Sequence, residues 1–128
     1  LIIFKVSYDS DFPTIIADEA RINQVLINLL DNAFKFTPDE GEVKLMANKD
    51  KDHILIQVID NGCGVSEEDL PYIKEKFYKG KGSKSHSGLG LSICDEIIKL
   101  HGGSMDIESK LNEGTRIIVS LPIAGGIA

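Results

Sequence analysis

The chain has 128 residues, of which 42% are hydrophobic and 27% charged, and its formal net charge at pH 7 is -6. These proportions exclude a disordered chain, and the longest apolar runs fall far short of the ~20 residues that a membrane-spanning helix needs. The acidic balance argues against nucleic acid as a partner, because affinity for a polyanion depends on basic side chains. The length predicts a single domain over residues 1–128. Because the chain opens directly on strand-like residues, we expect it to be a piece of a longer protein.

The first half of the chain is predicted to hold a strand, a long helix and a hairpin. Loose alternation of apolar and polar residues predicts a strand over 2–9, and a short β-like piece follows at 14–18. From residue 18 onward, apolar side chains recur at three- and four-residue steps, which predicts a helix of about five turns that stops before Pro38. Two antiparallel strands joined by a polar turn are expected next, at 42–49 and 53–60.

The second half is predicted to add two helices and two strands. The residues after the cap Ser66 predict a short helix towards Phe77, and the segment 79–88, rich in Gly, Ser and Lys, predicts a loop. A second long amphipathic helix is expected over 89–101. The last two strands are expected at 104–109 and 115–121, with a tail that frays from about residue 123. This order of elements predicts an α+β fold with helices on one face of a mostly antiparallel sheet.

The first helix carries an arc of polar side chains beside its apolar stripe. Five side chains fall within about 80° of the helix surface: Arg21, Gln24, Asn28, Asn32 and Lys35. A solvated face accounts for the first two, but Asn is a poorer helix former than the Glu or Lys that such a face usually carries. Amide oxygens suit a Mg2+ ion whose charge is balanced by phosphates, and Lys35 could meet those phosphates. The alternative is that all five side chains simply form a solvent-exposed polar face of the helix.

Asp60 ends the second strand of the predicted hairpin on its apolar side, in register with Ile54, Ile56 and Val58. An inward carboxylate is costly unless donors reach it, and an adenine amino group would be a fitting donor. The glycines of the turn 61–64 would let a flat ligand approach the backbone. An aspartate that caps its own loop is an equally good interpretation of the same spacing.

The second long helix begins at a glycine-rich segment. Gly88 and Gly90 would expose backbone N–H groups to an anion, helped by the helix dipole. The pattern is neither a Rossmann fingerprint nor a P-loop, so alone it is weak. Immediately upstream lie three lysines that could fold over a phosphate chain as a lid: Lys79, Lys81 and Lys84.

Five of these segments together resemble a known family. NLLDNAFKFTP, DNGCGV, KFYKG, GLGLSI and NEGTR occur in the order and spacing of the N, G1, F, G2 and G3 boxes of the ATP-binding catalytic domain of bacterial sensor histidine kinases. The resemblance covers residues 17–121. It implies a Bergerat-type two-layer sandwich, in which about five strands form a mixed, mostly antiparallel sheet and three helices pack on one face. It also implies ATP as ligand, held with Mg2+ between the helices and the lid.

The resemblance assigns roles residue by residue. Asn32 would be the Mg2+ ligand with Asn28 beside it, and Lys35 would contact a phosphate. Asp60 would receive the adenine amino group. The other implied contacts are Gly62 and Gly64, which admit the ring; Phe36 and Tyr78 at base or ribose; Lys79 near the γ-phosphate; Gly88, Leu89, Gly90 and Leu91 at the phosphate end; and Thr115 through water.

Three positions depart from the family pattern. His86 stands where the G2 box commonly has its first glycine, so a different lid hinge is expected, and Asn112 replaces a common glycine in the G3 box. Lys79 occupies the place of a frequent arginine and offers a point charge without a bidentate fork.

The resemblance also implies what this chain does not contain. His53, His86 and His101 are not in the acid-flanked context that the family phosphorylates, so the acceptor histidine is expected on a separate dimerisation domain of the same parent protein, with a response regulator downstream. The isolated domain is expected to be monomeric and cytoplasmic, within a parent that a membrane could anchor. Two alternatives stay open. One is a hydrolysing ATPase or clamp, although relatives such as gyrase carry a glutamate where Asn28 stands; the other is a binding-only, degenerate or anti-sigma-like module, which His86 would fit.

Overall fold

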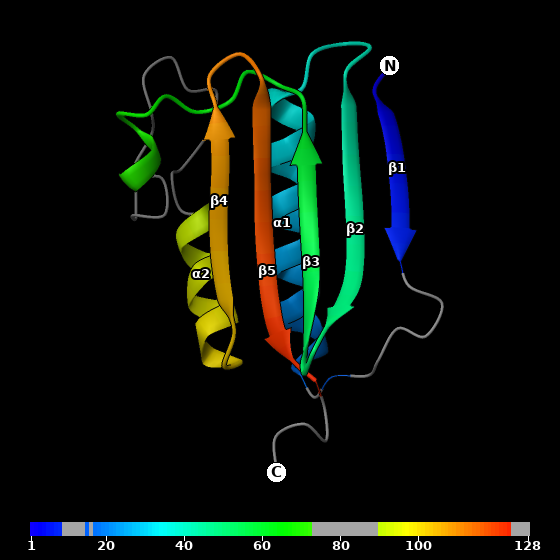
Figure 1. The fold of residues 1–128 in the computed structure, drawn as a ribbon, viewed down its shortest axis with the longest axis vertical. Coiled ribbons are helices and arrows are strands. Elements are labelled where there is room, and N and C mark those ends of the chain that lie inside the picture. Colours follow the sequence, from blue (N-terminus) through cyan, green and yellow to red (C-terminus); the bar gives the residue numbers. More distant parts are fainter. Residues whose placement is uncertain (9–14, 16, 73–89, 124–128) are drawn as a thin grey trace.

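A computed structural model of the chain describes residues 1–8, 15, 17–72 and 90–123. In chain order the elements are β1 (Ile3–Tyr8), α1 (Glu19–Phe36), β2 (Glu42–Asp50), β3 (His53–Asp60), the short 3-10 helix η1 (Leu70–Tyr72), α2 (Gly90–Leu100), β4 (Ser104–Lys110) and β5 (Gly114–Pro122) (Figure 1).

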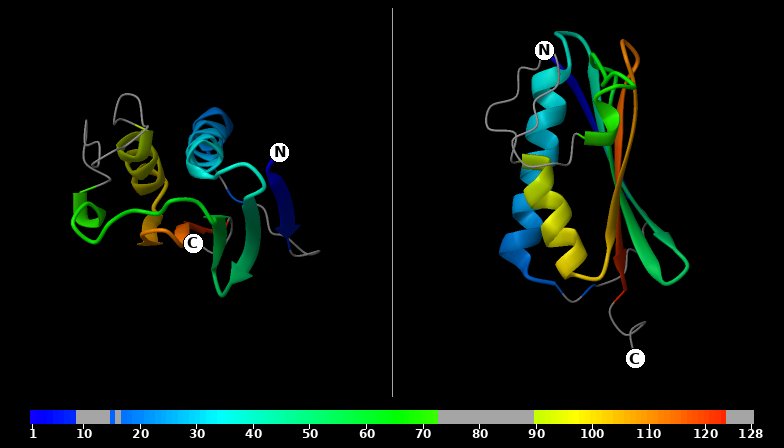
Figure 2. Two further views of the ribbon diagram at one scale, coloured as in Figure 1. Left: turned by 90° about the horizontal axis from the view of Figure 1, so that it is seen from above. Right: turned by 90° about the vertical axis from the view of Figure 1, so that its left-hand side faces the viewer.

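The strands form one mixed five-stranded sheet in the order β1-β2-β3-β5-β4. β1 runs parallel to β2, and the other neighbouring pairs are antiparallel. α1 and α2 lie side by side on the same face of this sheet (Figure 2). The prediction of an α+β fold with helices on one face of a mostly antiparallel sheet is therefore confirmed. Because β3 and β5 are antiparallel neighbours, the end of β3 is paired with the start of β5, and Asp60 lies opposite Thr115.

The core lies between the two helices and the inner face of the sheet. α1 buries Val25, Leu29 and Ala33, at the spacing that the sequence predicts for its apolar stripe. Asp18 is the N-cap of this helix and accepts a hydrogen bond from the Arg21 N–H (3.2 Å). The other buried apolar side chains are Val43, Ile54, Ile56, Val58, Cys94, Ile97, Ile98, Met105, Ile117, Val119 and Leu121. This packing fixes α1 against β3 and α2.

One histidine joins the two helices at the end of the domain away from Asp60. The His101 Nε2 atom accepts a hydrogen bond from the Asp18 backbone N–H (3.0 Å), and its Nδ1 lies 2.8 Å from the Ile97 carbonyl oxygen. Nε2 must be unprotonated to accept, so the ring is the neutral tautomer that donates from Nδ1. His101 thus serves to pack α2 against the start of α1.

Two predicted elements are wrong for the part of the chain that the structure describes. That part holds two α-helices rather than three. After Ser66 the chain forms only η1, because Pro71 would fall in the second turn of the predicted helix, where it has no N–H to donate and crowds the preceding turn; residues 73–77 lie outside the described residues. The β-like piece at 14–18 is not a strand at its described residues, 15, 17 and 18, since the chain turns there into the cap of α1.

Among the helices that the structure describes, none is long and apolar enough to cross a membrane. The tail predicted to fray begins at residue 123, and residues 124–128 lie outside the described part.

Candidate functional site

Asp60 is the last residue of β3 and carries a half-buried carboxylate. Burial raises the pKa of this carboxyl above its ordinary value, and backbone hydrogen bonds from Gly62 and Thr115 act in the opposite direction. The Gly62 N–H donates to Asp60 Oδ1 over 2.8 Å, which fixes how the carboxylate is turned. A carboxylate has lone pairs for further donors, so these backbone bonds leave it able to accept from a ligand as well.

The loop after Asp60 is held between α1 and the β4–β5 turn. The Cys63 N–H donates to the carbonyl of Phe36, the last residue of α1 (3.2 Å). A Cβ on Gly62 would lie 2.1 Å from that carbonyl oxygen, and one on Gly64, whose φ is +70°, would lie 2.1 Å from the Lys110 carbonyl oxygen. Both glycines are thus required by backbone packing. Their predicted role of admitting a ligand ring stays a prediction.

Ser109, on β4, was not singled out from the sequence, yet it organises this end of the sheet. Its Oγ donates to the Gly114 carbonyl (3.0 Å), accepts from the Val65 N–H (2.7 Å) and lies 2.8 Å from Thr115 Oγ1. A hydroxyl has one hydrogen and two lone pairs, so Thr115 must be the donor in the last bond. The Thr115 hydroxyl is therefore held in one orientation beside Asp60. The signal in the sequence is a serine at an inward position of a strand.

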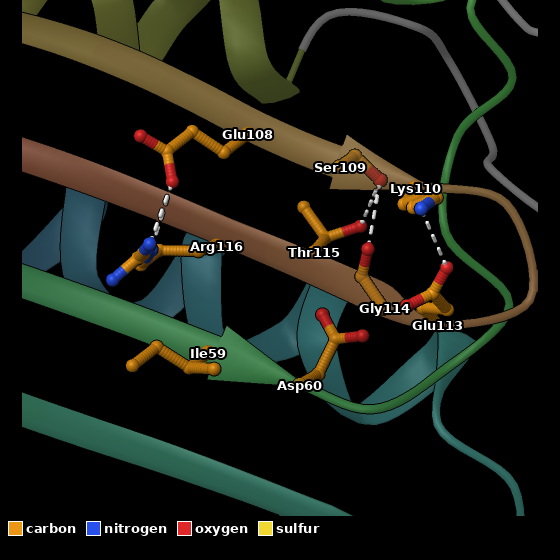
Figure 3. A pocket seen from close by; sticks show the side chains of 9 residues that line it. All are labelled: Ile59, Asp60, Glu108, Ser109, Lys110, Glu113, Gly114, Thr115 and Arg116. Atoms are coloured by element: carbon orange, nitrogen blue, oxygen red, sulfur yellow. Dashed lines mark hydrogen bonds and ion pairs between the residues drawn. The ribbon is translucent and has the colours of Figure 1, made fainter.

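A shallow cavity of about 390 Å³, wide open to solvent, lies at this end of the sheet (Figure 3). Asp60 and Thr115 line it, together with Ile59, Glu108, Ser109, Lys110, Glu113, Gly114 and Arg116. Figure 3 shows the Asp60 carboxylate directed towards the neighbouring strand β5. Two ion pairs lie along the rim: Arg116 Nη2 with Glu108 Oε1 at 2.7 Å and Lys110 Nζ with Glu113 Oε2 at 3.3 Å.

The predicted helix residues do not line this cavity. Asn28 and Asn32 are half-buried on α1, and the more exposed Lys35 has its Nζ 3.3 Å from Asp31 Oδ2. Asn32 lies one turn, about 6 Å of rise, before Phe36, whose carbonyl holds the loop after Asp60. The structure therefore brings Asn32, Lys35 and Asp60 to the same end of the domain, but not into one cavity.

The start of α2 contributes two of the predicted residues. Gly90 begins the helix, and a Cβ there would meet no described atom within 4 Å. Leu91 is half-buried and packs against the core. Four other predicted residues lie outside the described residues: Tyr78, Lys79, Gly88 and Leu89. The same holds for the lid lysines and for His86.

Comparison with known proteins decides the family. A model described as "Histidine kinase-, DNA gyrase B-, and HSP90-like ATPase" matches residues 17–125. The chain belongs to this family. This membership agrees with the resemblance of the five sequence motifs to those of the histidine kinases.

Individual relatives are sensor histidine kinases. The catalytic domain of histidine kinase ThkA, solved in nucleotide-free form, is 35% identical with a TM-score of 0.82, over 95% of this chain and 80% of that one. Full-length ShkA, solved in complex with AMPPNP, is 32% identical with a TM-score of 0.84, over 96% of this chain and 26% of that one. Sensor protein SrrB of Staphylococcus aureus is 36% identical over 120 residues, which are 91% of this chain and 19% of that protein. The chain thus spans about a fifth of the length of the curated relatives it matches.

The side-chain oxygens of this histidine-kinase-type domain suit a hard cation that takes few ligands from the protein. Among the described residues, no cluster of three or more His, Cys, Asp or Glu side chains could hold a metal. Mg2+ takes oxygen ligands and is commonly bound by one or two protein groups plus substrate phosphates. The half-buried amides of Asn28 and Asn32 fit an ion that arrives with a nucleotide.

Proposed function

We propose that this domain binds Mg2+ and ATP and presents the γ-phosphoryl group to an acceptor histidine on a separate dimerisation domain, in two-component signalling with a response regulator downstream. The observation that carries the proposal is the half-buried Asp60 carboxylate, oriented by Gly62 beside the hydroxyl of Thr115, at the end of the sheet where α1 also ends. The AMPPNP held by the relative ShkA supports a nucleotide as the ligand.

Asp60 gives the site its preference for adenine. The carboxylate, which the Gly62 N–H holds by Oδ1, accepts a further hydrogen bond from the adenine amino group. Guanine carries a carbonyl oxygen at that ring position, and two acceptors facing each other in a half-buried site are costly. The Thr115 hydroxyl, fixed by Ser109, contacts the base through water.

The α1 amides and the lysines act on the phosphate end. Asn32 holds the cation with Asn28 beside it, and Lys35 exchanges part of its pairing with Asp31 for a phosphate oxygen. Mg2+, when bound, neutralises charge on the phosphates and on the group being transferred. Contacts to the base or ribose by Phe36 and Tyr78, and to phosphates by Lys79, Gly88, Leu89, Gly90 and Leu91, belong to the same proposal, as does entry of the ring past Gly62 and Gly64.

Neither described histidine is suited to accept the phosphoryl group. Both ring nitrogens of His101 are engaged, with Asp18 and Ile97. His53 begins β3, and at about 3.3 Å per residue it lies some 20 Å along the strand from Asp60. Because the chain spans a fifth of the length of its curated relatives, we place the acceptor in another domain of the parent. We propose that residues 1–128 form a single monomeric domain that works in the cytoplasm, where ATP is supplied, in a parent that a membrane could anchor.

A hydrolysing ATPase or clamp is disfavoured by the residue at position 28. Activating water requires a group that accepts a proton, and the Asn28 carboxamide does not. The neighbouring acid on α1, Asp31, is exposed and pairs with Lys35 (3.3 Å). We therefore expect slow hydrolysis by the isolated domain. γ-Labelled ATP should likewise leave no stable label on it, and stable labelling would contradict a separate acceptor.

Thermal stabilisation by nucleotide tests the proposal. ATP with Mg2+ should raise the melting temperature, because a ligand that binds only the folded state stabilises it by mass action, and GTP should do so much less. Asp60→Asn and Asn32→Ala should each remove most of the ATP shift. Asp106→Asn, which neutralises an exposed carboxylate on β4, is the control and should keep it. A full shift in both site variants would refute the site, and no shift in the wild-type domain would favour the degenerate, binding-only module.

A further inference from the structure

An apolar face that the proposed nucleotide site does not use lies along β1 and the adjoining flank of α1. Ten large apolar side chains are exposed among the described residues, and five of them belong to this face, with exposed fractions of 37–69%: Phe4, Val6, Tyr8, Ile27 and Phe34. We call this set the β1–α1 face. Single apolar side chains are normal at a protein surface, but a contiguous set usually marks a place where another molecule packs.

The packing of β1 brings its part of this face against α1. The rings of Phe4 and Phe34 are in edge-to-face contact, with their centroids 5.4 Å apart. Phe4 is also paired with the fully buried Val43 in the parallel register of β1 with β2, so it is directed to the helix-bearing side of the sheet. Because side chains alternate along a strand, Val6 and Tyr8 share that side.

The face extends over about two turns of α1. β1 and α1 run in opposite directions (Figure 1). From the contact between Phe4 and Phe34, Tyr8 lies about 13 Å along the strand, and Ile27 lies about 10 Å back along the helix. Seven residues separate Ile27 from Phe34, so the two side chains lie on one stripe of the helix. Both elements therefore contribute apolar side chains at each end of the face.

The helix layer has room for a further helix at this position. A helix with its side chains is about 10 Å across and strands lie about 4.8 Å apart, so one helix covers about two strands. The two described helices pack against β3, β4 and β5. Among the described elements, none lies over the edge strand β1 on the side that α1 occupies (Figure 2). This geometry favours an occupant that is itself a helix, laid alongside α1.

The border of the β1–α1 face is acidic. Four exposed carboxylates lie along α1 and in the connection that follows it: Glu19, Asp31, Asp39 and Glu40. The connection reaches the start of β1, where the Glu40 N–H donates to the Leu1 carbonyl. Lys35 lies near this border, and its Nζ is 3.3 Å from Asp31 Oδ2. The net negative charge is complementary to lysine or arginine on a partner, and it would repel an anionic lipid surface.

We propose that the β1–α1 face is the docking surface for an amphipathic helix from outside residues 1–128, whose apolar stripe is flanked by lysine or arginine. The helix lies alongside α1, buries its stripe on the five apolar side chains and directs its basic residues to the carboxylates of the border. The contact is separate from the nucleotide site, because Asn28 is directed about 100° around α1 from Ile27 and Asn32 further still.

Binding of a model peptide tests the docking surface. A synthetic peptide of about 15 residues, about four helical turns, carries leucines along one side and lysines elsewhere. Titrated into the ¹⁵N-labelled domain, it should move the amide signals of β1 and of α1 around Ile27. Ile27→Gln should weaken binding at least about fivefold by removing apolar contact. Leu100→Gln, which replaces an exposed leucine at the end of α2, is the matched control and should keep the wild-type affinity.

Two further peptides separate apolar fit from charge. One has the same composition with its leucines spread around the helix, and the other has glutamates in place of the lysines. Both should bind at least about tenfold more weakly than the first peptide. Glu19→Gln combined with Asp31→Asn should weaken the lysine peptide about threefold. Asp50→Asn combined with Asp52→Asn, at the exposed turn between β2 and β3, is the matched control and should not.

Several results would overturn the proposal. These are absence of binding, signal changes confined to other surfaces, equal affinity of the three peptides, and equal affinity of Ile27→Gln and Leu100→Gln. Light scattering supplies an independent check, because a dimer of the wild-type domain that Ile27→Gln dissociates would make a second copy the occupant instead. The stabilisation by Mg2+ and ATP should be the same in Ile27→Gln as in wild type, so the outcome does not depend on the proposed function.

Discussion

Ser109→Ala removes the hydroxyl that joins β4, β5 and the loop after Asp60. That hydroxyl makes three hydrogen bonds, to Val65 (2.7 Å), Thr115 (2.8 Å) and Gly114 (3.0 Å). At about 0.5–1.5 kcal/mol net for each bond in a half-buried setting, the free energy of unfolding should fall by about 2–3 kcal/mol. For a domain of this length, that corresponds to a Tm lower by about 6–12 °C.

Urea unfolding followed by circular dichroism measures this loss directly. Ser104→Ala, an exposed position on the same strand, is the matched control and should stay within about 0.5 kcal/mol of wild type. ATP affinity should also fall in Ser109→Ala, because the Thr115 hydroxyl is no longer held in one orientation. A Ser109→Ala domain as stable as the Ser104→Ala control would show that the network contributes nothing, and the reasoning would be wrong.

Three further predictions follow from burial and backbone geometry. Because burial raises the pKa of Asp60, the folded state binds the carboxyl proton more tightly than the unfolded state does. The contribution of Asp60 to stability therefore falls as pH rises above about 3.9. Urea titrations should show Asp60→Asn at least as stable as wild type at pH 7, with the difference shrinking towards pH 3. A thiol reagent at pH 8 should label the exposed Cys63 and spare the buried Cys94, whose pKa is about 11, until urea is added; equal native labelling would contradict the packing. Gly64→Ala should cost about 2–4 kcal/mol in unfolding experiments, since φ is +70° and a backbone carbonyl of β4 fills the space. Gly90→Ala, at a helix start where a Cβ would meet no described atom within 4 Å, should cost nothing and gain up to about 1 kcal/mol.

The helices and strands could be predicted where local chemistry decides them. The apolar spacing of α1 predicts its buried residues Val25, Leu29 and Ala33, and Asp18 marks its start, because both signals lie within a few residues of the chain. The helix predicted after Ser66 is wrong in its described part, because Pro71 interrupts the helix that the Ser66 cap would begin.

The supports of the site could not be predicted, because they depend on strand order. Ser109 meets Thr115 only because β5 inserts between β3 and β4, and this order is a property of the whole sheet. The same holds for Gly62, whose missing side chain makes room for a carbonyl of α1 that lies far away in the sequence. The inward alternation of Asp60 could be read from the chain, and so could a bond to its own loop, which the Gly62 N–H makes. The strand register that places Thr115 opposite it could not.

The most direct test of adenine recognition compares ATP with inosine triphosphate, which differs at the base by a carbonyl in place of the amino group. In the wild-type domain, calorimetric titration should show ATP binding at least about tenfold more tightly, the worth of one charge-assisted hydrogen bond. In Asp60→Asn the Gly62 N–H keeps the amide oxygen at its place, so the amide N–H2 faces the base and the preference should vanish or reverse. Equal affinity for both nucleotides in wild type, or an unchanged preference for ATP in Asp60→Asn, would contradict the account.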